Sequence, residues 1–212
     1  MTNQPPGTFP LALEQTLNIK YLSPEELLRL YHAYWRWFEE PEGKRYRRRD
    51  RARHWLIFLF LRFTGARVSE VLSLNDTRDV DFREGLVRLP ILKRHVLRKK
   101  GQRRNVPVPS SILGELGRIL AEFPGLRGRI FSVHRSAVFR HFRARAQEAG
   151  LPQELRHPHV LRHTRAIEML RAGVPVTVVQ EILGHASLTT TAIYLRFSAQ
   201  EIKTILRDRG LI

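Results

Sequence analysis

Five side chains suited to phosphate binding and nucleophilic attack are spread over distant parts of the chain. In chain order they are Arg67, His159, Arg162, His185 and Tyr194. Guanidinium groups bind phosphate oxygens through a planar fork of donors, and their charge does not titrate near neutral pH. Two guanidiniums, two imidazoles and one phenol, if folding unites them, could direct a tyrosine to attack a phosphodiester.

Each of these residue types also has an ordinary structural use. A histidine such as His159 is commonly a cap or a core residue, and a tyrosine such as Tyr194 commonly packs with a satisfied hydroxyl. A metal site is a further alternative, because His159 and His163 are one helical turn apart and His157 is near. The sequence lacks the glutamate that metalloproteases place between such histidines and any nearby carboxylate as a third ligand. The pattern therefore favours a site without metal.

The bulk composition indicates one core and a polyanionic partner. With 212 residues, 42% of them hydrophobic, the chain is long enough for one sizeable core or two small ones, and one domain is the simplest interpretation. Its 37 Lys and Arg outnumber 20 Asp and Glu, which gives a formal net charge of +17. Such an excess favours nucleic acid or an anionic membrane surface as partner. The absence of cysteine excludes disulfides and thiolate metal sites, and we expect a cytoplasmic, nucleoid-associated protein.

The first twenty residues differ from the rest of the chain. They contain three prolines and lack the charged start and apolar run of a signal peptide. We expect residues 1–20 to form a flexible arm and residues 21–212 to form one folded domain. The longest apolar run, Leu56–Leu61, is far too short to cross a bilayer, so a membrane is not expected as a partner.

The hydrophobic pattern predicts an α+β domain that is mainly α-helical, with a small three-stranded antiparallel sheet. Ser23 and Glu26 can form a capping box around Pro24, which predicts a helix from Pro24 to about Phe38. Alternating segments predict strands at 80–82, 86–92 and 105–108, with a basic turn between the last two. Helical spacing predicts further helices at 46–63, 68–74, 111–122, 136–149, 160–172, 176–183, 188–197 and briefly after 198.

Two basic clusters and one basic helix are candidates for phosphate contacts. Seven of the ten residues from 44 to 53 are Lys or Arg, as are seven of the twelve from 93 to 104. A charge run is often only a solvated face, but two such clusters on one domain favour nucleic acid. The helix expected at 136–149 has an apolar stripe opposite its arginines. The DNA-binding candidates are Lys44, Arg45, Arg47, Arg48, Lys100, Arg103, Arg135, Arg140 and Arg143.

Three short motifs contain the five chemical side chains. They are Thr64-Gly65-Ala66-Arg67-Val68-Ser69-Glu70, then His159-x-x-Arg162-His163-Thr164, and then Leu183-Gly184-His185-Ala186-Ser187 followed by three threonines and Tyr194. In order and spacing they resemble the catalytic domain of the tyrosine recombinase family, also called phage integrases. The resemblance extends from about Tyr21 to the C-terminus. It implies a site-specific recombinase or integrase that acts on double-stranded DNA without a cofactor, a metal or a small-molecule substrate.

The resemblance also implies a role for each side chain. Arg67 and Arg162 would clamp the oxygens of the scissile phosphate and offset the charge of the transition state. His159 and His185 would hydrogen-bond the same phosphate and assist proton movement. Tyr194 would attack phosphorus, which gives a 3′-phosphotyrosine link and a free 5′-hydroxyl. Because the covalent ester conserves the energy of the backbone bond, the step could be reversed without ATP.

The family also uses a lysine on the sheet hairpin as the general acid for the leaving oxygen. Lys93 matches the usual distance from the start of its strand, whereas Lys100 precedes a glycine in the turn, as in some members. Lys93 is the preferred candidate. Glu70 follows Arg67 by three residues and could orient its guanidinium or remain a solvated charge.

Two features bear on assembly. Family members commonly have an N-terminal domain that closes around DNA from the opposite side, and only about twenty residues precede the catalytic domain of this chain. We therefore expect no such domain, and enclosing the DNA from both sides would need another protein or a second copy. The tail ends in an amphipathic segment around Ile202, Ile205 and Leu206, which could dock onto a neighbouring protomer or pack in cis. The resemblance implies a homo-oligomer, a tetramer, on DNA.

Two other functions compete with strand transfer. One is a catalytically silent or accessory DNA-binding protein that retains the recombinase fold, which the missing grip domain suggests. The other is an RNA-binding protein, which the basic composition alone would permit. No aromatic-displaying sheet or related RNA motif is apparent, so the sequence favours DNA.

Overall fold

The computed structural model describes residues 19–40, 45–91 and 102–185, together with Thr191, Arg207 and Gly210. Four of the candidate residues lie outside this described part: Lys44, Lys93, Lys100 and Tyr194. The helices expected at 188–197 and after 198 also lie outside it, apart from the single helical residues Thr191 and Arg207. In the described part, no helix is both long and apolar enough to span a membrane.

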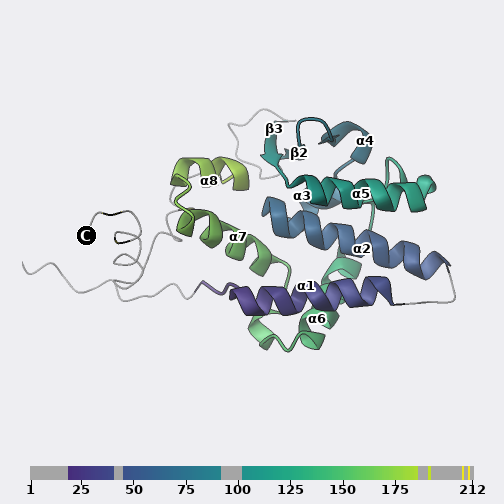
Figure 1. Cartoon of the computed structure of the whole chain (residues 1–212), viewed down its shortest axis with the longest axis horizontal. Helices are drawn as coiled ribbons and strands as arrows, with labels where there is room; N and C mark the ends of the chain where they lie inside the picture. Colours follow the sequence, from purple (N-terminus) through teal and green to yellow (C-terminus); the bar gives the residue numbers. More distant parts are fainter. Residues whose placement is uncertain are drawn as a thin grey trace, which may run out of the picture.

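A long central helix organises the core. α2 (Arg45–Thr64) is buried on all sides from Trp55 to Leu61, as expected of a helix that is surrounded by others. Four long helices pack against it, α1 (Pro24–Glu39), α5 (Ser110–Glu122), α6 (Arg135–Glu148) and α7 (His159–Arg171), as does the short α3 (Val68–Leu72). In Figure 1, α5 and α1 run along opposite sides of α2, and α7 lies beside the C-terminal end of α2.

A small sheet and several short helices complete the domain. β1 (Val80–Asp81), β2 (Leu86–Pro90) and β3 (Arg103–Pro107) form an antiparallel sheet in the order β1-β2-β3. Val87, Leu89 and Val106 point from it into the core. The short elements are α3 (Val68–Leu72), α4 (Asp76–Asp79), the 3-10 helices η1 (Pro124–Leu126) and η2 (Gln153–Leu155), and α8 (Val176–Leu183).

The fold class and most of the expected elements are confirmed. The capping box of α1 is present: Glu26 N donates to Ser23 Oγ at 3.2 Å, and Ser23 N donates to a Glu26 carboxylate oxygen at 2.9 Å. Helix bounds differ from the expected ones by at most two residues, and α8 has the expected bounds. The third strand begins at Arg103, two residues before its expected start, because Arg103 and Arg104 pair with Pro90 and Leu89. The sequence analysis did not predict α4 or the two 3-10 helices.

Candidate active site

The turn that ends α2 places Arg67. Gly65 has φ 62°, a left-handed conformation that costs a residue with a Cβ about 1–2 kcal/mol. The Thr64 hydroxyl accepts a hydrogen bond from Ala66 N at 3.1 Å, which closes the turn. Arg67 then becomes the N-cap of α3, with its side chain 17% exposed. The Thr-Gly-Ala-Arg motif is thus a compact reversal between two helices that presents a guanidinium.

Glu70 holds this guanidinium. One carboxylate oxygen accepts from Arg67 Nη1 at 2.8 Å, and the other accepts from the backbone N of Arg67 at 2.9 Å. The Glu70 side chain is fully buried. Of the two alternatives from the sequence, Glu70 therefore orients Arg67 and is not a solvated charge. Burial acts to raise the pKa of Glu70, but the hydrogen bond and charge of Arg104, with those of Arg67, outweigh it and lower the pKa. The carboxylate is therefore ionised at neutral pH.

Arg162 joins the segments that carry the other candidates. It lies in the first half of α7 and is 5% exposed. Its Nη1 donates to the Gly65 carbonyl at 2.8 Å and its Nη2 donates to the Leu183 carbonyl at 2.9 Å. Those carbonyls stand two residues before Arg67 and two before His185. One buried guanidinium therefore fixes the turn of the first motif to the end of α8 in the third.

His185 is held by its neighbours on both sides. Gly184, the C-cap of α8, has φ 68° and turns the chain so that His185 is buried. Thr191 Oγ1 lies 2.8 Å from His185 Nδ1, at hydrogen-bond distance, and Thr191 is itself fully buried. Gln180 Nε2 donates to the His185 carbonyl at 3.2 Å. These contacts fix the position of the imidazole in the site.

His159 begins α7, and its surroundings are positively charged. Partial burial lowers its pKa below the usual value, and the charges of His157, Arg162, Arg135 and Arg67 lower the pKa further. The imidazole is therefore neutral at pH 7 and can accept a proton or hydrogen-bond a phosphate. Arg162 follows His159 by about one turn of α7 and bonds the turn that carries Arg67, so the three side chains belong to one region.

The described members of the predicted site therefore come together. Arg67, His159, Arg162 and His185 belong to one region built from α3, the start of α7 and the end of α8. Lys93 and Tyr194 lie outside the described residues, so their place in it stays a prediction.

Two residues of this region were not found by sequence reasoning. Arg104 on β3 donates to Glu70 at 2.7 Å, and Thr191 contacts His185. Thr191 was noted only as one of the three threonines before Tyr194, and Arg104 was counted only within a basic cluster. A signal existed for Arg104: it falls on the core-facing alternation of its strand, between exposed neighbours.

Helix α6 presents three exposed basic candidates. Arg135, Arg140 and Arg143 are exposed, whereas Phe142 and Ala146 on the opposite stripe are buried. The Arg135 guanidinium stacks 5.2 Å from the centre of the Phe139 ring. The exposed face borders a groove of about 880 Å³ that is lined by His134, Arg135, Ser136, Phe139, Arg140, Arg143, Ala144 and Gln147.

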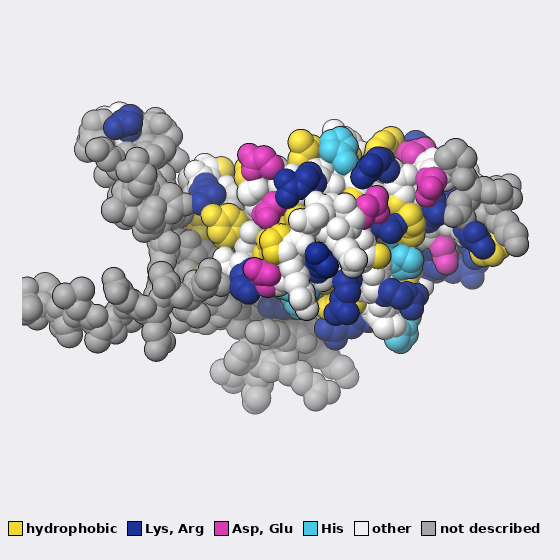
Figure 2. All heavy atoms as spheres, turned by 90° about the horizontal axis from the view of Figure 1, so that it is seen from below, with side chains coloured by type: hydrophobic (Ala, Val, Ile, Leu, Met, Phe, Trp, Pro, Cys, Tyr) yellow, Lys and Arg dark blue, Asp and Glu magenta, His cyan; other side chains and the backbone are white. Residues whose placement is uncertain are grey.

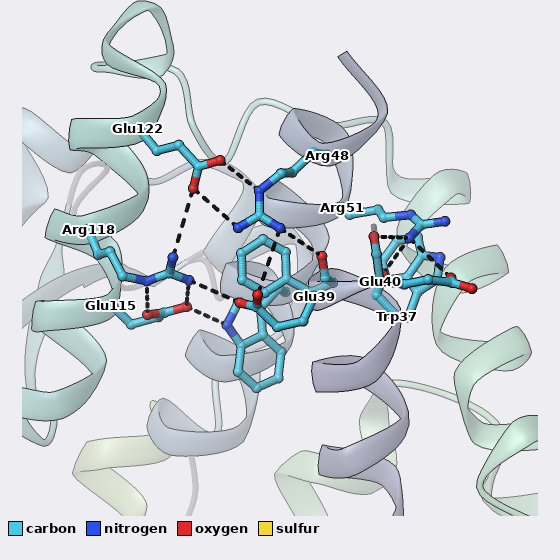
Figure 3. A network of polar contacts seen from close by, with 10 residues as sticks. Trp37, Glu39, Glu40, Arg48, Arg51, Glu115, Arg118 and Glu122 are labelled. Carbon is cyan, nitrogen blue, oxygen red and sulfur yellow. Dashed lines mark hydrogen bonds and ion pairs between the residues drawn. The ribbon is translucent and has the colours of Figure 1, made fainter. Parts of the chain in front are cut away.

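The basic cluster at the start of α2 is largely engaged in the fold. Arg48 donates to Glu122 at 2.7 Å and lies 3.8 Å from Glu39, which ties α2 to α5 and α1. Arg118 on α5 extends this network through two hydrogen bonds of 2.8 Å to Glu115. Figure 3 shows these side chains as one continuous set of ion pairs between the three helices.

Other members of the basic clusters differ in their environment. Arg51 donates to the Trp37 carbonyl at 2.7 Å, and Arg53 donates to the Ile130 carbonyl at 3.0 Å. Arg103, at the start of β3, forms an ion pair with Asp79, at the end of α4. Arg47 is exposed, and Arg45 is the first residue of α2. Figure 2 shows basic, acidic and apolar side chains interspersed on the face seen from below.

Comparisons with known proteins agree with these motifs. The model of the phage integrase family matches residues 20–201. The tyrosine recombinase XerA of Pyrococcus furiosus is 32% identical over 77% of this chain and 57% of its own length. A tyrosine recombinase of Thermosipho africanus is 36% identical over 66% of this chain and 48% of its own. The chain therefore spans about half the length of these curated relatives.

Solved structures give the same result. The crystal structure of XerA recombinase superposes with a TM-score of 0.68 at 28% identity, covering 89% of this chain and 64% of that one. XerH recombinase, bound to its difH substrate before cleavage, superposes with a TM-score of 0.66 at 25% identity, covering 87% of this chain and 53% of that one. With the family match, the ordered motifs and the fold in agreement, the chain belongs to the phage integrase family.

Proposed function

We propose that this protein cuts and rejoins DNA strands at specific sites through a 3′-phosphotyrosine intermediate on Tyr194. The observation that supports this most is the double contact of Arg162 with the carbonyls of Gly65 and Leu183. It makes the segments of Arg67 and His185 one rigid unit, as a phosphate clamp requires. Family membership adds the expectation that the phenol of Tyr194 completes the site.

In the proposed reaction, the phenolic oxygen of Tyr194 forms a bond to phosphorus as the bond to the 5′-oxygen breaks. Arg67 and Arg162 offset the charge that develops on the nonbridging oxygens. A phenol has a reference pKa of about 10, so its proton must leave during attack, and the neutral His159 is suited to receive it. Lys93, or Lys100 in its place, donates a proton to the departing 5′-oxygen.

The site supplies positive charge without a bound cation. Arg67 retains Nε and Nη2 for a substrate, because within the described residues only its Nη1 has a side-chain hydrogen bond. The tyrosine ester that forms is comparable in energy to the bond it replaces, so a 5′-hydroxyl from the same or another strand can reverse the step. Rejoining then needs no ATP.

Double-stranded DNA is the proposed substrate. The XerH structure holds that protein with its difH substrate, and this chain shares its fold. The exposed arginines of α6 are the proposed contacts to phosphates and base edges along the groove that they border. We place the catalytic unit at residues 21–212 and propose that it works as a homo-oligomer, a tetramer, on DNA.

A nicked suicide duplex, from which the short leaving strand diffuses away, tests the proposal. We expect a covalent complex between protein and DNA that survives denaturation and that Tyr194→Phe abolishes at unchanged DNA affinity. A silent DNA-binding protein would give the opposite result: binding with ordinary salt dependence, no adduct on any duplex, and a Tyr194→Phe protein that is equivalent to the parent.

A further inference from the structure

We propose that Arg104 is a positioning residue of this site, which acts through Glu70 on Arg67 and holds the base of the lysine-bearing hairpin against the other two motifs. The inference rests on the strand-transfer function proposed above. Arg104 itself would not touch DNA: its side chain is 3% exposed, and every contact described below is to the protein.

The guanidinium of Arg104 contacts three separate segments. Its Nη2 donates to Glu70 at 2.7 Å, its Nε donates to the Ile182 carbonyl at 2.7 Å, and its Nη1 lies 3.3 Å from the Pro90 carbonyl. These partners belong to α3, α8 and the end of β2. Arg162 makes a comparable link, from α7 to the carbonyls of Gly65 and Leu183. The site thus has two buried arginines that tie its parts together, one on α7 and one on β3.

The sequence makes room for this side chain. A Cβ on Gly184 would lie 2.8 Å from Arg104 Nη1 and 3.0 Å from its Cζ, too close for an unshifted side chain. The glycine before His185 is therefore needed twice: for its φ of 68° and for the space that Arg104 occupies.

The contact to Glu70 bears directly on the phosphate clamp. One Glu70 oxygen receives Arg104, and the other receives Arg67 Nη1. With two guanidiniums on one carboxylate, the triad keeps a net charge of +1, whereas Glu70 alone would neutralise Arg67. Arg104 thus leaves Arg67 fixed in direction yet attractive to a phosphate. A lysine could supply the charge but not three donors in a planar fork.

Arg104 also fixes where the hairpin begins. Residues 92–101, which carry both candidate lysines, connect Ile91 after β2 to Gln102 before β3. Arg104 pairs with Leu89 in the register of the sheet and reaches the Pro90 carbonyl, so it fastens the base of that connection to α3 and α8. Figure 1 shows β3 beside α8 at this corner of the molecule.

Single-turnover cleavage of a nicked suicide duplex tests the proposal, with adduct formation at saturating protein measured separately from DNA affinity. For Arg104→Met we expect a cleavage rate constant lower by about 100-fold, since small misplacements of reacting groups cost that much, and a Kd within about 3-fold of the parent. Arg104→Lys should recover part of the rate. In a Glu70→Gln background the same Arg104→Met change should lower the cleavage rate constant by less than about 5-fold, because Glu70, the residue through which Arg104 acts, is already altered.

Arg62→Met is the matched control. It removes a mostly buried arginine, whose side chain is 13% exposed and makes two short bonds to Glu168, at 2.6 and 2.7 Å, that tie α2 to α7. We expect a similar loss of thermal stability and little loss of cleavage rate. Equal cleavage rates for Arg104→Met and the parent would overturn this inference but not the proposed function. So would rate losses in Arg104→Met and Arg62→Met that stand in the same proportion to their losses of thermal stability. An Arg104→Met protein that does not fold leaves Arg104→Lys and Glu70→Gln to decide: parental rates in both overturn it. A parent that forms no adduct removes the proposed function and, with it, this inference.

Discussion

At the residue scale, two glycines decide how closely the motifs approach one another. Gly65 and Gly184 both adopt left-handed conformations, with φ of 62° and 68°. Each also faces a side chain from a distant part of the chain: Leu183 in the case of Gly65, and Arg104 in the case of Gly184. The glycines in the Thr-Gly-Ala-Arg and Leu-Gly-His motifs therefore serve both backbone conformation and packing.

Replacement of Gly65 tests this reasoning. In Gly65→Ala the new Cβ would meet Leu183 Cδ2 at 2.6 Å in a strained backbone conformation. We expect the free energy of unfolding to fall by about 2 to 5 kcal/mol, measured by urea denaturation. Gly114→Ala on α5 is the control, because its Cβ meets nothing within 4 Å, and it should be neutral or slightly stabilising. Equal stabilities for the two variants would contradict the assigned geometry.

A buried histidine predicts how stability depends on pH. Burial lowers the pKa of His54 to about 3, with further lowering by His141, whose ring centre is 4.1 Å away, and by Arg53 and Arg140. In the unfolded chain the pKa is about 6.5, so between these values only the unfolded chain binds the proton. Stability is complete above pH 6.5 and falls as the pH drops toward 3, by up to about 1.4 kcal/mol per pH unit from this group.

Chemical denaturation at several pH values between 7 and 4 measures this slope. His54→Phe, which cannot titrate, should show a shallower loss of stability than the parent. His32→Gln, a change of an exposed histidine on α1, serves as control and should keep the parental slope. A His54→Phe protein with the parental slope would show that His54 does not contribute.

The chemistry of single residues was predictable, but their supports were only partly so. Arg67, His159, Arg162 and His185 were found because their types and order are distinctive. Glu70 was found because it lies one helical turn from Arg67. Arg104 was missed because its partner is 34 positions away, and no local pattern reports a contact of that range.

At the scale of elements, basic segments of similar composition have different environments. The start of α2 is an ion-paired junction in which Arg48 bonds Glu122 on α5. Helix α6 instead exposes Arg140 and Arg143 beside a groove. Net charge along the sequence could not separate the two, because the acids that engage Arg48 lie on two other helices, α1 and α5.

The salt dependence of DNA binding separates these two elements. Each phosphate contact contributes about 0.9 to the slope of log K against log salt. The double variant Arg140→Gln, Arg143→Gln should therefore lower the slope by about 2, measured by fluorescence anisotropy on one duplex. Arg48→Gln should lower thermal stability and change the slope less. A larger slope change in Arg48→Gln would show that the network at α2 opens to contact DNA.

Amphipathic elements were predictable, and very short ones were not. α1, α5, α6, α7 and α8 were predicted because apolar residues recur at helical spacing over two or more turns. α4 has only four residues and forms around the Asn75 cap, whose side chain accepts from Thr77 N at 3.0 Å. So short a segment has no periodicity to detect, and tertiary contacts decide its conformation.

At the scale of the whole molecule, the fold assembles a site from residues that are nearly a hundred positions apart. The bond from Arg162 to Gly65 spans 97 positions, and the bond from Arg104 to Ile182 spans 78. α2 and α7 pack side by side (Figure 1). The turn that follows α2 therefore contacts Arg162 on α7. The order of the motifs in the sequence predicted that these residues come together. The hydrogen bonds of Arg162 and Arg104 that hold them in place could be identified only from the structure.

The identity and polarity of the protein–DNA bond test the central claim most directly. After trapping on a nicked duplex and digestion with protease and nuclease, mass spectrometry of the remaining peptide locates the attached nucleotide. The account predicts a nucleotide joined through its 3′-phosphate to Tyr194, with a free 5′-hydroxyl on the other strand end that a polynucleotide kinase can label. Attachment at another residue, or a link through a 5′-phosphate, would contradict it.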